Sequence, residues 1–170
     1  MNEIEKLKEK QEKLERDLEE LGTQIDELEK KEITKSGKRW RGVKDRFYWY
    51  IEGDCKVYGE YEKDDDYDNA RYEMGNYFRA KEEAEKILEK IKIYMQLKDF
   101  ALQLNKGREI DWEDDEQEKY YIYYDRETMK LDYNSSWSYQ NIGQICCLDK
   151  QFLNKAKCEI GEDNLKKLFE

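Results

Sequence analysis

Two runs of acidic side chains are the segments of this chain best suited to hold a cation. Residues 64–68 (DDDYD) contain four carboxylates, and residues 111–118 (DWEDDEQE) contain six. Carboxylate oxygens are ligands that Ca²⁺ and Mg²⁺ prefer, but neither run has the alternating acidic positions, the sixth-position Gly and the twelfth-position Glu of an EF-hand loop. We interpret both runs as solvated loops and expect no bound metal and no cofactor.

The same acidic runs could serve a second chemistry, the imitation of nucleic acid. Carboxylates beside exposed aromatic rings can match the spacing of phosphates and bases, and can therefore occupy a basic channel on another protein. Under this hypothesis the residues that contact the partner are Asp64, Asp65, Asp66, Asp68, Asp114 and Asp115.

Histidine is absent from the chain, which excludes much enzyme chemistry. Its absence removes the commonest general acid/base, the triads that need an imidazole and the usual zinc ligand sets. The four cysteines, Cys55, Cys146, Cys147 and Cys158, form no CxxC pair and are expected to be reduced structural thiols. Because no Gly-rich phosphate loop or nucleophile elbow is present either, the sequence predicts no catalytic residue.

Tyrosine is concentrated in residues 120–124 (YYIYY), which predict a β-strand. Side chains of one parity in a strand face the core and those of the other parity face outward. An aromatic outer face that could dock a partner is therefore expected, formed by Tyr121, Tyr123, Trp137 and Tyr139. The alternative is that these rings are core residues or cross-strand pairs.

Residues 1–33 carry the heptad pattern of a coiled coil. The a and d positions form one narrow stripe, made of Ile4, Leu7, Gln11, Leu14, Leu18, Leu21, Ile25 and Leu28. A stripe of this width cannot bury itself, so the segment is expected to be an oligomerisation helix. The alternative is a charged helix packed against its own domain.

Charges beside the stripe favour parallel association of identical chains. Glu3 would pair with Lys8 of a second copy, and Lys10 with Glu15. Gln11 at an a position lowers stability but helps to fix the register. We expect a dimer first, with a trimer left open.

Residues 34–39 are expected to be a linker, and residues 40–170 an α+β body that repeats one pattern twice. Each half, about 40–105 and 112–170, has an aromatic hairpin, a short apolar segment and then a helix. The fold prediction is therefore a coiled-coil helix followed by a duplicated β-β-β-α body. The helices are expected at about 81–104 and 150–169, the second broken near Gly161.

The chain has 170 residues, of which 44% are charged, and a net charge of −10. No apolar run approaches a membrane span and no secretory signal is present, so we expect a cytoplasmic protein without a membrane partner. Direct nucleic-acid binding is not expected, because the one basic stretch, residues 35–41, is short and lies in an acidic chain.

Three strings resemble small proteins encoded by phages and prophages of low-GC Gram-positive bacteria. They are GNYFRAKEEAEK (75–86), DWEDDEQEKYYIYYD (111–125) and IGEDNLKKLF (160–169), and the resemblance covers about residues 40–170. It implies a genetic context and a shared hairpin-plus-helix body, but no functional residues.

These observations lead to a first functional hypothesis. The chain would be a non-enzymatic phage protein that oligomerises through its coil and binds a host protein, inhibiting a host defence system such as a CRISPR effector. The alternative is a structural or assembly protein of the phage, and an unrecognised enzyme comes third.

Overall fold

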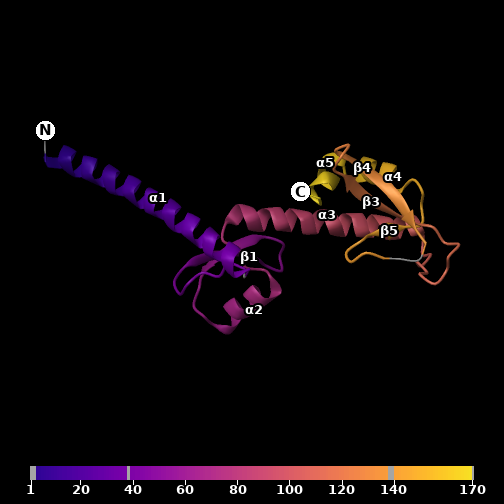
Figure 1. Ribbon diagram of the computed structural model, residues 1–170, viewed down its shortest axis with the longest axis horizontal. Helices are drawn as coiled ribbons and strands as arrows, with labels where there is room; N and C mark the ends of the chain where they lie inside the picture. The colour runs from indigo at the N-terminus through magenta and orange to yellow at the C-terminus, as the bar shows by residue number, and fades with distance from the viewer. Residues whose placement is uncertain (1–2, 38, 138–139, 170) are drawn as a thin grey trace. The chain divides into compact units, whose positions relative to one another are not determined.

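The computed structural model describes residues 3–37, 39–137 and 140–169. Helices and small antiparallel sheets are both present, beginning with a long N-terminal helix, as the sequence predicted (Figure 1). The chain divides into two compact units. Residues 1–50 and 58–81 form the first unit, and residues 51–57 and 82–170 form the second. No helix in the described residues is long and apolar enough to span a membrane.

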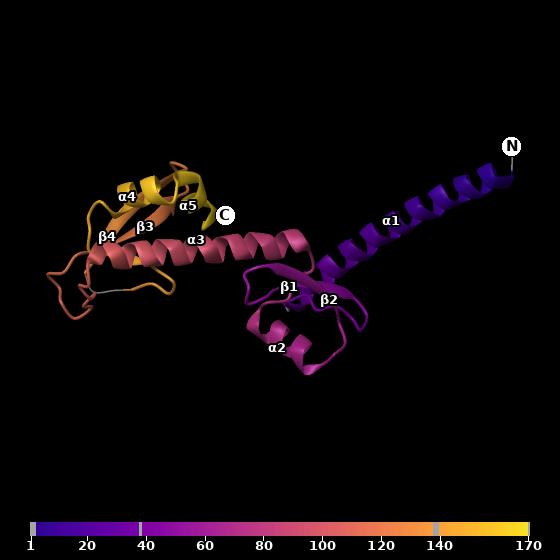
Figure 2. The ribbon, with the colours of Figure 1, turned by 180° about the vertical axis from the view of Figure 1, so that it is seen from behind.

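Helix α1 (Glu3–Ser36) is the longest element of the first unit and runs without interruption (Figures 1 and 2). Its Glu, Lys, Leu and Gln residues are strong helix formers, and Glu3 and Glu5 in the first turn favour the positive end of the helix dipole. The helix ends before Gly37, whose φ of 63° is the left-handed conformation that commonly ends helices. Residues 34–36 of the expected linker are therefore helical.

Strands β1 (Phe47–Ile51) and β2 (Val57–Tyr61) form the first hairpin, where the aromatic pattern predicted it. The hairpin depends on a glycine at position 59, because the ring of Phe47 lies over that position. The same ring packs edge-on against Trp49 and Tyr61, at centroid distances of 5.2 and 4.9 Å. Trp49 also forms an isolated antiparallel bridge with Phe78.

Helix α2 (Asp66–Met74) lies where the sequence led us to expect a loop. Asp65 accepts hydrogen bonds from the backbone N–H groups of Tyr67 and Asp68, and the Asp68 side chain completes a capping box. Gly75 ends the helix with a φ of 80°. The expectation of a loop was wrong because Asp65 and Asp68, three positions apart, form a helix-start signal within the acidic run.

The second unit contains a three-stranded antiparallel sheet in the order β4-β3-β5 (Figure 1). Strand β3 (Lys119–Asp125) pairs with β4 (Lys130–Ser136) along its whole length and with β5 (Cys146–Cys147) at two residues. Helices α3 (Lys81–Asn105), α4 (Phe152–Glu159) and α5 (Glu162–Lys167) supply the other core residues. The buried core consists of Leu97, Ala101, Leu131, Cys147, Phe152, Leu153, Ala156 and Leu165.

The pairing pattern of the two hairpins is similar but not equal. In both, the first strand pairs antiparallel with a later short segment, Phe78 in one and β5 in the other. A three-stranded sheet forms in the second unit alone, and α2 has no counterpart there among the described residues. Helix α3, which the sequence assigned to the first repeat, supplies core residues of the second unit. Duplication of the body therefore stays a prediction.

Replacing Gly59 with Ala should destabilise the first hairpin. A Cβ atom there would lie 2.4 Å from two ring carbons of Phe47, so the aromatic packing must shift. We expect a loss of about 1–3 kcal/mol in the free energy of unfolding, measured by chemical denaturation. Gly53→Ala is the control, because nothing lies within 4 Å of its Cβ position. Equal effects at the two glycines would contradict this packing.

Candidate functional site

Every a and d position of α1 is exposed to solvent. Relative exposure of the seven apolar residues runs from 43% at Ile25 to 68% at Leu18. Gln11 is also exposed, and its amide donates a hydrogen bond to Glu15 on the same helix, at 2.9 Å. The alternative of a helix packed on its own domain would bury this stripe. The structure of one chain leaves it uncovered, while the coiled coil itself stays a prediction.

Asp64, Asp65 and Asp66 of the first acidic run are exposed, but two of them already have local roles. Asp64 accepts a hydrogen bond from Arg41 at 3.2 Å, and Asp65 is the N-cap of α2. Asp66 lies in the first turn of α2.

Asp68 is not available to a partner, which corrects its assignment to the acidic surface. Its relative exposure is 1%. Its carboxylate accepts hydrogen bonds from the Tyr48 hydroxyl at 2.5 Å and from the backbone N–H of Lys63 at 2.7 Å. Burial alone would raise the pKa of Asp68, but these hydrogen bonds outweigh it and leave the pKa below its ordinary value.

A second buried carboxylate, Glu62, completes a polar cluster in the first unit. It accepts hydrogen bonds from Arg41 at 3.1 Å and from the Tyr77 hydroxyl at 2.6 Å. The rings of Tyr48 and Tyr77 stack at 3.9 Å between their centroids. Burial and the bonds to the carboxylates raise the pKa of both tyrosines, so each phenol keeps its proton and acts as a donor rather than a nucleophile. We interpret the cluster as a structural element of the core.

Asp114 and Asp115 of the second acidic run are exposed in the second unit. The side chain of Asp114 accepts a hydrogen bond from the backbone N–H of Glu116. The backbone carbonyl of Asp114 accepts a hydrogen bond from the Lys119 ammonium at 2.7 Å. Among the described residues, no group of three or more acidic or cysteine side chains is arranged to hold a metal ion.

Tyr121 and Tyr123 lie on β3, and their parity differs from that of Ile122 and Tyr124, which pack against the core. Both tyrosines line a hollow of about 320 Å³. Trp137, just after β4, is 48% exposed. Tyr139 lies outside the described residues.

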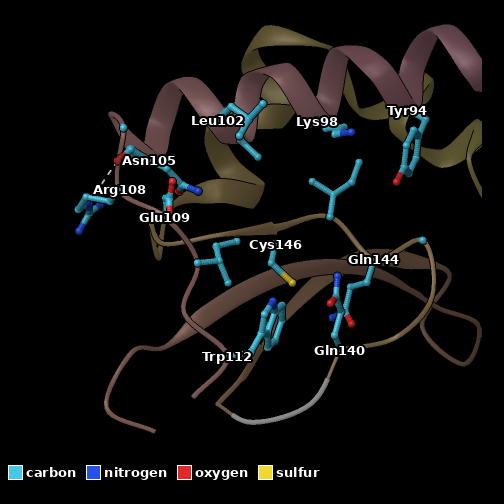
Figure 3. A pocket seen from close by; sticks show the side chains of 15 residues that line it. Tyr94, Lys98, Leu102, Asn105, Arg108, Glu109, Trp112, Gln140, Gln144 and Cys146 are labelled. Carbon is cyan, nitrogen blue, oxygen red and sulfur yellow. Dashed lines mark hydrogen bonds between the residues drawn. The ribbon is translucent and has the colours of Figure 1, made fainter. Parts of the chain in front are cut away.

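A larger cavity of about 590 Å³ lies beside this hollow in the second unit (Figure 3). Trp112, Cys146 and Gln144 line one part of it, and Lys98 and Tyr94 on α3 line another. The thiol of Cys146 is protonated near neutral pH, because burial and the adjacent Cys147 raise its pKa to about 11. Sequence reasoning missed this cavity because its walls come from separate segments, α3, the loop after it and residues 140–146, that share no motif.

Comparison of the chain with protein-family models, with curated proteins and with solved structures gave no match. The sites therefore have to be interpreted from their own geometry.

Removing the carboxylate of Asp68 should destabilise the first unit. Asp68→Ala leaves the Tyr48 hydroxyl and the Lys63 N–H without their acceptor, a loss of about 2–4 kcal/mol. Because the folded pKa of Asp68 lies below its ordinary value of 3.8, its stabilisation is complete above about pH 5 and is lost as the pH falls through the folded pKa. Denaturation of parent and variant from pH 2 to 7 measures both effects.

Asp66→Ala is the matched control for this experiment, because Asp66 is an exposed carboxylate on the same helix. Its stability should stay within about 0.5 kcal/mol of the parent. If both variants lose the same stability, the buried role of Asp68 is wrong.

Proposed function

We propose that this chain is a non-enzymatic interaction protein, which self-associates through α1 and binds another protein through its body. The observation that carries the proposal is the exposed apolar stripe on a helix of 34 residues. Burying one Leu or Ile side chain contributes roughly 1.5–3 kcal/mol, and a second copy of α1 offers a stripe of the same width and length to bury it.

Gln11 favours a parallel arrangement of the two helices. In a parallel pair, the a position of Gln11 faces Gln11 of the second copy, so the two amides can hydrogen-bond to each other. In an antiparallel pair that aligns the same four heptads, Gln11 faces Leu21 of the second copy. That arrangement would bury an amide against an apolar side chain without a partner, which costs free energy.

The charges near the middle of α1 support the same orientation. The aligned antiparallel pair would place Asp17 beside Asp17 of the second copy, and Glu15 beside Glu15. Like charges at these flanking positions are unfavourable. The parallel pair instead sets Lys10 beside Glu15. A parallel pair also brings the two bodies to the same end of the coil, where they can engage a partner together.

Two substitutions in the stripe test self-association. Leu14→Asp with Leu21→Asp places charges in the seam, each costing several kcal/mol if unpaired, and should yield a folded monomer. Light scattering of the full chain measures the mass, and circular dichroism checks the fold. Lys13→Asp is the control, since it changes the net charge by the same two units at a position outside the stripe. A parent that is already monomeric would contradict the proposal.

We propose further that the chain comes from a phage or prophage and that its partner is a host protein. The most specific form of this proposal is that the partner is a host defence protein such as a CRISPR effector. The resemblance of residues 40–170 to phage-encoded proteins supports the origin. The net charge of −10 and the exposed Asp66 and Asp115 support binding to a basic surface. This partner would be identified by affinity purification from the bacterial host with the full chain as bait.

Charge reversal tests the contribution of the acidic runs to binding. Asp66 and Asp115 are suited to it, because the side chains of both are exposed and neither caps a helix. Asp66→Lys with Asp115→Lys should slow association with the identified partner about tenfold at low salt, and much less above about 0.5 M. Glu9→Lys with Asp99→Lys gives the same change in net charge elsewhere. Unchanged association for both pairs would remove the acidic mechanism and leave binding to the aromatic surface.

A further inference from the structure

Strand β3 has one edge that is only partly paired. On one side β4 pairs with all of Lys119–Asp125, but on the other side β5 pairs with Tyr120 and Tyr121 alone. In an antiparallel sheet, alternate residues direct their N–H and C=O groups to each side. Along residues 122–125 the groups on the β5 side have no backbone partner among the described residues. This free edge follows directly in line with β5.

The hollow of about 320 Å³ lies beside the first part of the free edge, at Ile122 and Tyr123. Its walls come from β3, from α3, from the end of the chain and from the segment before β5, and no charged side chain lines it. Ile142 in that segment is fully exposed. Its apolar lining includes Leu97, Ile122, Ile142, Ile145, Leu168 and Phe169.

The segment before β5 is held away from the free edge by a turn. Gly143 has a φ of 77°, which interrupts an extended chain. The N–H of Gln144 bonds to the carbonyl of Asn141 at 3.1 Å, and the N–H of Asn141 bonds to the side-chain oxygen of Gln144 at 2.9 Å. These bonds fix the segment as a turn, so β5 does not continue along β3.

Pro and exposed Lys, which often protect an edge strand, are missing here. Natural sheets also protect edges by covering them with a helix or loop, and here residues 141–145, Leu168 and Phe169 flank the edge but leave the hollow between them open. The chain has no Pro, and the two charged residues of β3 are engaged elsewhere. Lys119 is buried and bonds to the carbonyls of Asp114 and Trp137, while the carboxylate of Asp125 accepts hydrogen bonds from Glu127 and Thr128 in the β3–β4 turn. The other residues of the free edge are Ile122, Tyr123 and Tyr124, and these residue types favour strand pairing.

We infer that the free edge of β3 binds an extended segment of a partner protein by β-strand addition. The segment supplies backbone N–H and C=O groups to residues 122–125, and its alternate side chains, which are apolar, enter the hollow. The occupant is a single extended segment, because the unpaired backbone groups span only four residues and the hollow of about 320 Å³ beside them has room for a few side chains. This inference rests on the proposed function and names the chemistry of the partner.

The test uses the full chain and linear peptides selected for binding from a random twelve-residue library. A selected peptide should slow hydrogen exchange of backbone amides within residues 122–125 that exchange freely without it. N-methylation along the peptide should weaken binding by tenfold or more at every second residue of its paired part, because only alternate N–H groups face β3. The other positions should change affinity only slightly.

Matched protein variants locate the binding site. Tyr123→Ala removes a ring that lines the hollow and should weaken peptide binding about tenfold. Tyr67→Ala removes an exposed ring on α2, outside the hollow, and should leave the affinity unchanged. Circular dichroism controls for folding.

The inference is overturned if the library yields no binder, if exchange protection maps outside β3, or if N-methylation shows no alternation. Protection, without peptide, of the amides of residues 122–125 that face away from β4 also overturns it, because a second copy or the segment 141–145 would then fill the edge. The monomeric Leu14→Asp, Leu21→Asp variant should bind the peptide as the parent does. Failure of self-association and failure of strand addition are therefore measured separately.

Discussion

The apolar side chains of α1, from Ile4 to Leu28, lie in one narrow stripe. The helix cannot bury this stripe unless it packs against another surface. In α1 all seven of these side chains remain exposed although the helix is unbroken over 34 residues. A helix in a protein gains most of its stability from packing its apolar face against another surface, so α1 needs a surface of matching width and period. A second α1 meets both conditions, and the assembly that we propose follows from that constraint.

Within the first unit the corresponding constraint is the burial of two carboxylates. Glu62 and Asp68 lie among stacked tyrosines, and each is satisfied by hydrogen bonds from a phenol and from other donors. Such a network fixes the positions of β1, β2 and α2 relative to one another, because the loss of one member leaves the others without hydrogen-bond partners. The acidic residues from Glu62 to Asp68 therefore fall into two groups. Glu62 and Asp68 are buried and structural, and Asp64, Asp65 and Asp66 are exposed.

Regular periodicity made the long elements predictable. The heptads of α1 and the helical spacing of α3 repeat over many residues, and the aromatic runs of β1 and β3 are typical of strands. The structure has these elements within a few residues of the predicted bounds. Helix α2 was missed because its signal is two aspartates three positions apart inside a run of aspartates. The burial of Asp68 could not be predicted, since it depends on Tyr48, a residue 20 positions away. The free edge of β3 was also beyond the sequence, because it results from the early end of β5.

The most direct test of the central claim is disulfide crosslinking across the proposed coil. In a background with the exposed cysteines replaced, Cys55→Ser and Cys158→Ser, a Leu7→Cys variant places one thiol at a d position near the N-terminus. Parallel helices bring the two copies of this position together, so mild oxidation should convert the protein to a covalent dimer of unchanged fold. Antiparallel helices would instead join Leu7→Cys to an Ile25→Cys variant when the two are mixed. A crosslink in that mixture alone, or none in either, would contradict the account.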